Sequence, residues 1–233
     1  MFLTFSMLKL KYLENVNSEM ERKVGLLFIN PYFGTDMELG EAVINDGILF
    51  EEELRKRGYS VYKFIDTTAS TFAEKVITYS TMDLDSLLIY YSGHGMSVRD
   101  RNGDESDRKD EAFVFRDGYL LDDISNKLIA GNRAKHLFLI SDCCHSGTIW
   151  DNVNPESTCV ISACQDDQTA KQTAFPIHFN SKKSMKTNGV LTYYLWKYMP
   201  RCSDDLFETI RQINPLLKKY NQKATITGEF HKL

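Results

Sequence analysis

Compact apolar runs alternate along the chain with stretches of helical periodicity. Runs that are apolar at successive positions predict strands buried on both faces, at 23–30, 59–66, 86–95, 135–144 and 158–165. Apolar residues spaced three or four apart predict helices over 37–58, 68–80, 121–131, 190–199 and 204–220. This order predicts an α/β sandwich of three layers, with a mostly parallel central sheet and helices on both faces. Two polar stretches interrupt it, a charged loop over 96–111 and a linker over 165–189.

Composition and charge narrow the class of protein. The 233 residues fit one domain, and the formal net charge of −4 gives no support for nucleic acid or an anionic membrane as a partner. No apolar run reaches the roughly 18 residues of a transmembrane helix, and the N-terminus lacks the features of a signal peptide. Five cysteines are too few for a disulfide scaffold. We therefore expect a reducing, cytoplasmic location.

Two motifs end separate strands of the predicted sheet. The run 86–95 ends in SGHG, and the run 135–144 leads into SDCCHSG. In parallel sheets ligands gather at the carboxyl ends of the strands. The fold and the motifs therefore indicate the same edge of the sheet.

The chemistry of these motifs favours a nucleophile over a metal or a redox pair. Cys143, Cys144 and His145 are consecutive, whereas zinc ligands are usually spaced by two or more residues, and a redox pair resembles C-x-x-C. A nucleophilic cysteine needs a base that forms its thiolate. His94, 50 residues before Cys144, can supply it, and its flanking glycines favour exposure at a site over an ordinary loop histidine.

Four segments together resemble a metacaspase, a caspase-like cysteine peptidase of clan CD. They are YYSGHG, SDCCHSG, VISACQDDQTA and NGVLTYYLW, and the resemblance runs from about Lys23 to at least Met199. It implies that Cys144 is the nucleophile, that His94 activates the thiol and protonates the leaving amine, and that the backbone N–H groups of Gly95 and Cys144 stabilise the oxyanion. The alternation of side chains along a strand (strand parity) agrees with this, because it places Cys143 on the opposite face from Cys144.

The carboxylate of Asp142 and the family resemblance together predict which residue precedes the cleaved bond of the substrate. Asp142 lies two residues before Cys144 on the same face, where it can pair with arginine or lysine of a protein or peptide substrate. The resemblance adds Ser92 and Asp46 to this substrate-binding set and implies cleavage after basic residues. The alternative for Asp46 is a solvated helix residue.

The resemblance also implies activation by calcium through four aspartates. Asp110, Asp122, Asp123 and Asp151 match the family pattern, and carboxylate oxygens suit calcium. A shortened segment before the second element leaves Asp107 as an alternative to Asp110. On residue type alone, these side chains would be solvated loop acids or acids at a helix start.

The implied domain organisation is a short extension and one peptidase domain. The extension spans 1–22 and the domain 23–233, with a part similar to the caspase large subunit up to about 165, a linker over 166–188 and a part similar to the small subunit over 189–233. The resemblance implies a monomer that cuts itself after lysine, with Lys171, Lys182, Lys183 and Lys186 as candidates. Two alternatives stay open: a scaffold that acts by binding, and a peptidase of the same clan with another preference.

Overall fold

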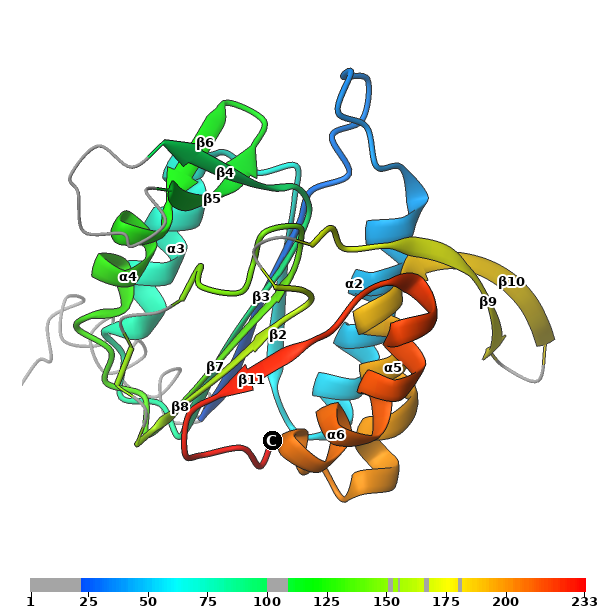
Figure 1. Cartoon of the computed structure of the whole chain (residues 1–233). Coiled ribbons are helices and arrows are strands. Elements are labelled where there is room, and N and C mark those ends of the chain that lie inside the picture. The colour runs from blue at the N-terminus through cyan, green and yellow to red at the C-terminus, as the bar shows by residue number, and fades with distance from the viewer. Residues whose placement is uncertain (1–21, 100–108, 151–152, 155, 166–167, 180–181) are drawn as a thin grey trace, which may run out of the picture.

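The central feature is a six-stranded sheet, seen in a computed structural model that describes residues 22–99, 109–150, 153–154, 156–165, 168–179 and 182–233. Its strand order is β11-β8-β7-β3-β1-β2 (Figure 1). The strands are β1 (Lys23–Ile29), β2 (Ser60–Ile65), β3 (Ser86–Ser92), β7 (His136–Asp142), β8 (Thr158–Ser162) and β11 (Thr225–Thr227). All neighbours pair in parallel except β11, which is antiparallel to β8. The predicted, mostly parallel sheet is confirmed.

Helices cover both faces of this sheet, as predicted. One face carries α2 (Glu41–Lys56), α5 (Val190–Tyr198) and α6 (Leu206–Leu217), and the other carries α3 (Ala69–Ser80) and α4 (Asp122–Ile129) (Figure 1). Strand β1 shows why its sequence is apolar at successive positions. Leu27 and Ile29 pack into the cluster with α2, α5 and α6, whereas Leu26 and Phe28 pack into the cluster with α3. Two short 3₁₀ turns, η1 (Met199–Cys202) and η2 (Lys218–Tyr220), flank α6.

Two small antiparallel sheets lie largely where the sequence predicted a charged loop and a linker, although a short strand was expected at 112–115. Strands β4 (Gly95–Arg99), β5 (Lys109–Phe115) and β6 (Gly118–Leu121) form the first, so residues 96–99 are a strand rather than a loop. Strands β9 (Gln172–Phe179) and β10 (Lys182–Gly189) form a hairpin within the stretch expected to be a linker (Figure 1). Alternating Phe175 and Ile177 are buried, which anchors this polar stretch as a strand. The proposed division into large-subunit-like and small-subunit-like parts stays a prediction.

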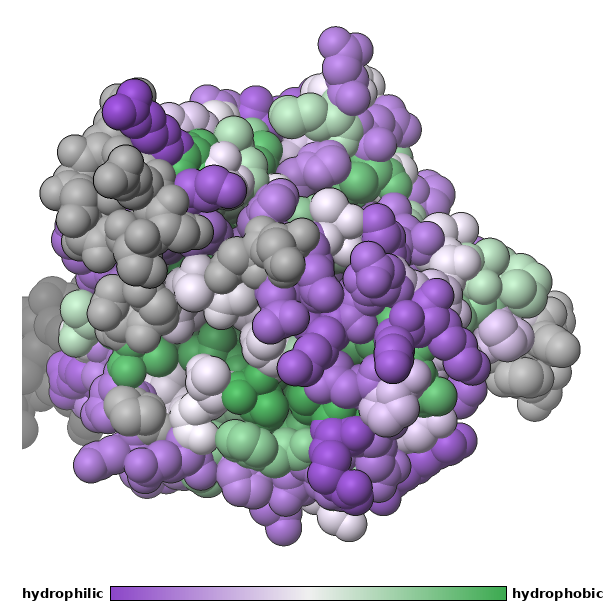
Figure 2. Space-filling model, viewed as in Figure 1, coloured by the Kyte–Doolittle hydropathy of each residue, from purple (hydrophilic) through white to green (hydrophobic). Residues whose placement is uncertain are grey.

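The surface seen in Figure 2 is mostly polar, with apolar residues visible near β8 and β11. Ile226 of β11 and the nearby Phe230 are only partly buried and pack against the core. Among the described residues, no helix has the length and apolar character needed to cross a membrane. The expected monomer stays a prediction.

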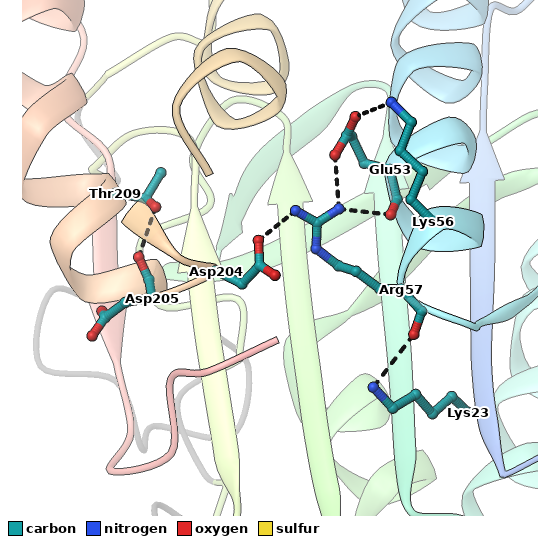
Figure 3. A network of polar contacts seen from close by, with 7 residues as sticks. All are labelled: Lys23, Glu53, Lys56, Arg57, Asp204, Asp205 and Thr209. Carbon is teal, nitrogen blue, oxygen red and sulfur yellow. Dashed lines mark hydrogen bonds and ion pairs between the residues drawn. The ribbon is translucent and has the colours of Figure 1, made fainter. Parts of the chain in front are cut away.

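A partly buried arginine joins α2 to the start of α6, at the end of the sheet where β1 begins (Figure 3). The Arg57 guanidinium donates to the carboxylate and the backbone carbonyl of Glu53, both at 2.7 Å, and forms an ion pair with Asp204. The side chains of Arg57 and Glu53 are only 10% and 5% exposed. This network therefore links segments that are about 150 residues apart in the sequence.

Arg57→Ala is expected to lower the free energy of unfolding by about 2–3 kcal/mol, because it leaves the buried Glu53 carboxylate with only Lys56, which is 55% exposed, as its cationic partner. Partial exposure of Asp204 keeps the expected loss below that of a fully buried pair. Urea unfolding measures the loss. Arg55→Ala is the matched control, because Arg55 pairs with Glu51 while 54% exposed and should cost less than about 1 kcal/mol. Equal losses in both variants would contradict the structural role assigned to Arg57.

Candidate active site

The two sequence motifs meet at the carboxyl ends of adjacent strands. Strand β3 ends at Ser92 and β7 ends at Asp142, and these two residues are partners in the register of the sheet. The segments that follow contact each other directly. A Cβ atom at Gly95 would lie 2.0 Å from the Cys144 carbonyl oxygen, so only glycine fits beside the Cys144 backbone.

A small pocket of about 200 Å³ opens at this edge. It contains both side chains of the predicted dyad, together with the three predicted substrate-binding residues. Its lining consists of Leu39, Asp46, Ser92, Gly93, His94, Asp142, Cys144, Ala170, Lys171, Gln172 and Gly189. The structure therefore brings together residues that lie up to 150 positions apart in the sequence, from Leu39 to Gly189. Of the predicted catalytic set, only Gly95 lies beside this lining rather than in it.

Cys144 is half-buried, whereas its neighbour Cys143 is 1% exposed. Burial raises the pKa of the Cys144 thiol, and the carboxylate of Asp142 raises it further, whereas a backbone hydrogen bond at Ala170 and the positive charge of Lys171 lower it. The thiol therefore needs a base before it can attack at neutral pH. The opposite burial of the two cysteines agrees with the parity argument.

The imidazole of His94 is oriented by a backbone carbonyl. Its Nε2 lies 2.8 Å from the carbonyl oxygen of Met37, in the loop between β1 and α2. A carbonyl can only accept a hydrogen bond, so Nε2 must carry the proton in this arrangement. Nδ1 is then the nitrogen that is left to accept a proton from a thiol.

Two buried carboxylates lie in the pocket beside the start of α5. Asp142 accepts hydrogen bonds from the Thr192 backbone N–H at 3.1 Å and the Thr192 hydroxyl at 2.7 Å. Asp46 accepts from the Asn188 side-chain amide at 2.9 Å and from the Gly189 N–H at 3.0 Å. All these donors are neutral, apart from the partial positive charge of the helix N-terminus. Asp46 is 1% exposed, so the alternative of a solvated helix residue is wrong.

Burial and mutual repulsion make these carboxylates hard to ionise. Burial, followed by the charge of Asp142, raises the pKa of Asp46 well above its ordinary value. Burial also raises the pKa of Asp142, although the hydrogen bonds from Thr192 oppose the shift. No cationic side chain among the described residues forms an ion pair with either carboxylate. A cation that enters the pocket would relieve this repulsion.

The structure describes only some of the residues predicted to bind calcium. Asp110 and Asp122 are 7% and 4% exposed, and Asp122 accepts hydrogen bonds from the backbone N–H groups of Glu111 and Asp123. Asp151, and Asp107 as the alternative to Asp110, lie outside the described residues. Within the described part of the chain, no group of three or more His, Cys, Asp or Glu side chains is arranged to hold a metal ion. Because Asp151 lies outside this part, the four-aspartate calcium site stays a prediction.

Several residues that line or support the pocket were not predicted as site residues, although Asn188, Gly189 and Thr192 lie in the segment NGVLTYYLW. Met37 contributes only a carbonyl, and Asn188, Gly189 and Thr192 hold the carboxylates from the junction of β10 and α5. Lys171 comes from the stretch expected to be a linker. That segment was the usable signal, because it carries part of the family resemblance.

Comparisons with known proteins agree with this geometry. A family model described as the caspase domain, Peptidase C14, matches residues 22–232. Metacaspase-1 of Arabidopsis thaliana is 34% identical over 122 residues, which are 39% of this chain and 33% of the relative. Metacaspase-1 of Kluyveromyces lactis is 31% identical over 152 residues, 56% of this chain and 34% of the relative. These matches span about a third of each relative's length.

Solved structures show the same fold at low sequence identity. The crystal structure of caspase-1 from Spodoptera frugiperda superposes with a TM-score of 0.63 at 11% identity, covering 91% of this chain and 88% of the other. A protein from Geobacter sulfurreducens superposes with a TM-score of 0.68 at 19% identity, covering 88% of this chain and 92% of the other. Since the family model matches nearly the whole described chain, the protein belongs to the caspase-domain peptidase family, with metacaspases among its relatives.

Proposed function

We propose that this protein is a cysteine endopeptidase that cleaves after arginine or lysine. The observation that carries the proposal is the single pocket that holds Cys144, His94 and the two buried carboxylates Asp46 and Asp142. The pocket combines a nucleophile, a base and an anionic site for a basic side chain. Family membership supports the class of reaction.

The first half of the reaction forms a thioester. Nδ1 of His94 takes the proton of the Cys144 thiol, and the sulfur attacks the carbonyl carbon of the scissile peptide bond. The carbonyl oxygen becomes an oxyanion, which the backbone N–H groups of Gly95 and Cys144 stabilise. As the intermediate collapses, the C–N bond breaks and His94 protonates the leaving amine.

The second half releases the acid product. Water enters after the amine has left, His94 takes a proton from it, and the oxygen attacks the thioester carbon. The C–S bond then breaks, and the Cys144 sulfur regains a proton from His94. The hydrogen bond from Nε2 to the Met37 carbonyl keeps Nδ1 available through both halves.

The basic side chain of the substrate would lie between Asp46 and Asp142, with the Ser92 hydroxyl as a further acceptor. The test is a set of peptide reporters that differ only in the residue before the cleaved bond. Arginine and lysine reporters are expected to give kcat/KM values at least about 100-fold above those of aspartate or norleucine reporters, because only a cation neutralises the two carboxylates. Equal turnover of the aspartate reporter would contradict the assigned specificity.

Gly189→Ala is expected to lower kcat/KM for arginine reporters by about 10-fold or more, mainly through KM. A Cβ atom there would lie 2.5 Å from Asp142 Oδ2 and 2.9 Å from Asp46 Oδ2, so it would displace the carboxylates. The backbone at Gly189 has an ordinary φ of −58°, so alanine adds no backbone strain. Gly131→Ala is the matched control, because its Cβ would meet nothing within 4 Å. Unchanged kinetics in Gly189→Ala would contradict the location of the substrate-binding site.

Calcium activation is part of this proposal only as an ordering effect, and no catalytic step runs through the metal. Its support is the homology to metacaspases and the carboxylates of Asp110, Asp122 and Asp123 on β5 and α4. The Thr148 hydroxyl donates to Glu111 at 2.7 Å, which links this acidic region to the loop after Cys144. Thermal unfolding with and without millimolar calcium tests binding independently of activity. A shift that disappears in Asp122→Asn would support the proposal, and no shift would overturn it.

Self-cleavage after lysine is the remaining element of the proposal. Both backbone polar groups of Lys171 are hydrogen-bonded, to Gln222 and Val190, which disfavours cutting at Lys171. Lys186 lies in the middle of β10, paired with β9. Lys182 and Lys183 begin β10 at the end of the hairpin, where fewer hydrogen bonds must open. Cleavage is therefore expected at Lys182 or Lys183 first.

A further inference from the structure

Two buried tyrosines enclose the peptide unit of His94. Tyr32 follows β1 and Tyr91 is the second-last residue of β3, and their exposed fractions are 0% and 1%. A Cβ atom at Gly93 would lie 2.7 Å from the Tyr32 hydroxyl and 2.9 Å from the Tyr91 hydroxyl. Both hydroxyls are therefore packed directly against the backbone that carries the proposed base.

The hydrogen bonds around His94 can be assigned from the number of protons available. The His94 N–H donates to the Tyr32 hydroxyl at 2.9 Å, and the Tyr91 hydroxyl lies 2.8 Å from the His94 carbonyl oxygen. Each phenol has one proton, and the Tyr32 hydroxyl also lies 2.7 Å from the Val114 carbonyl oxygen. Since carbonyls only accept, Tyr32 donates to Val114, whereas the single Tyr91 proton faces two acceptors, the His94 carbonyl at 2.8 Å and the Val114 carbonyl at 2.5 Å. The His94 N–H is thereby held by the Tyr32 phenol, and the His94 carbonyl accepts from the Val114 N–H at 3.1 Å with the Tyr91 hydroxyl beside it.

The Tyr32 ring also touches the imidazole itself. The two ring centroids are 5.0 Å apart, with an interplanar angle of 34°. Tyr32 adopts a left-handed backbone conformation with φ of 53°, which is unusual for a bulky residue, and the Asp66 carboxylate accepts its backbone N–H at 2.7 Å. Tyr32 begins the loop that carries the Met37 carbonyl. Strained residues cluster at functional sites, and this one lies between two supports of the same histidine.

The alternative is that both tyrosines only fill the core. Phenylalanine would fill the same space without burying a hydroxyl, which is costly unless it is hydrogen-bonded. The two hydroxyls lie 3.1 Å apart, and both reach the backbone of His94. Burial raises the pKa of Tyr32 to about 12, so its phenol stays neutral and does not take part in proton transfer. What the two hydroxyls can do is hold the histidine.

We infer that Tyr32 and Tyr91 are positioning residues, whose hydroxyls fix the His94 backbone so that the imidazole is held toward Cys144. This inference rests on the proposed function, because it assumes that His94 is the base. Neither phenol touches the reacting atoms in this role. Their removal should therefore impair the chemical step rather than substrate binding.

Tyr32→Phe and Tyr91→Phe test the inference, with Tyr59→Phe as the matched control. Tyr59 is 4% exposed and its hydroxyl bonds to Ser86 at 2.6 Å, so its removal also deletes one buried hydrogen bond, but at the start of β3. With an arginine reporter, kcat is expected to fall about 10- to 100-fold in Tyr32→Phe and less in Tyr91→Phe, with KM unchanged. Tyr59→Phe should change kcat less than about twofold.

A second readout separates positioning from a general loss of stability. The rate of Cys144 alkylation by iodoacetamide against pH reports thiolate formation, and its midpoint is expected to move to higher pH in Tyr32→Phe but not in Tyr59→Phe. Equal kcat values in Tyr32→Phe, Tyr91→Phe and Tyr59→Phe would overturn the inference. If Tyr32→Phe fails to fold, Tyr91→Phe decides alone. Full activity in His94→Ala would instead overturn the proposed function, whatever the tyrosine variants show.

Discussion

Cys144→Ala is expected to lower kcat for an arginine reporter by about 10⁴-fold or more. The thioester cannot form without the sulfur. No other side chain of the pocket lining takes its place as an activated nucleophile. Substrate binding should persist, because the carboxylates of Asp46 and Asp142 are untouched. Reporter turnover measures kcat, and competition by the mutant for a fluorescent peptide measures the retained binding.

Cys143→Ala is the control for this variant. Cys143 differs from Cys144 by one position but is buried in the cluster with α3 and α4. Burial raises the pKa of its thiol well above the ordinary value, so it cannot act as a thiolate at neutral pH. Its removal should keep kcat within about 10-fold and cost some stability. Activity lost in Cys143→Ala and kept in Cys144→Ala would contradict the assignment of the nucleophile.

A folded wild-type protein without turnover of any reporter would favour a different class of function. The pocket would then belong to a caspase-like scaffold that acts by binding. Circular dichroism establishes that the tested protein is folded, and alkylation of Cys144 establishes that the thiol is accessible. Detectable turnover that disappears in Cys144→Ala excludes the scaffold.

Asp142→Asn is expected to lower kcat/KM for arginine reporters by about 10²- to 10³-fold. The asparagine keeps an oxygen that can accept from Thr192, so the support of α5 is preserved and only the charge is lost. Asp46→Asn should act in the same direction, because Asp46 lines the same pocket. Reporters with an uncharged residue before the cleaved bond are the control, and their slow turnover should not fall further.

The pH dependence of these variants has a definite sign. The folded-state pKa values of Asp46 and Asp142 are raised, so the folded protein holds protons that the unfolded chain releases. The two carboxylates therefore destabilise the empty protein increasingly as pH rises from the ordinary aspartate range through the raised values. Asp142→Asn removes part of this effect and should raise the melting temperature at neutral pH. KM for arginine should fall with rising pH in wild type, as the pocket ionises.

Lower activity combined with higher stability would be characteristic of a binding site built from repelling charges. If Asp142→Asn lost activity and stability together, Asp142 would be a structural cap of α5 instead. Uncharged reporters would then lose turnover as well.

The sequence allowed the sheet and the position of the dyad to be predicted, because both depend on local patterns. Strands β3 and β7 are apolar along their lengths, and parallel pairing brings their ends together. The shared edge of the motifs that hold His94 and Cys144 was therefore predictable, whereas the adjacency of β3 and β7 is shown by the structure. Asp142 followed from strand parity, two residues before Cys144.

The other pocket residues depend on tertiary packing and leave no local pattern. Asp46 looks like an ordinary acid on a surface helix, and only the resemblance indicated its role. Its burial arises because α2 lies beside the junction of β10 and α5, where Asn188 donates to it. Phe175 and Ile177, which alternate in β9, carried a strand signal within a polar stretch. That signal was too short to outweigh the surrounding lysines and serines.

The central claim is that Cys144 is the nucleophile of a pocket selective for basic residues. Labelling with a peptidyl chloromethyl ketone that ends in arginine, followed by mass spectrometry, tests both parts at once. Attack by a thiolate forms a C–S bond and releases chloride, and His94 assists this step. We predict one label per chain, on Cys144, with much slower labelling in Asp142→Asn and by the analogue that ends in aspartate. Labelling of another cysteine, or equal labelling by the aspartate analogue, would contradict the account.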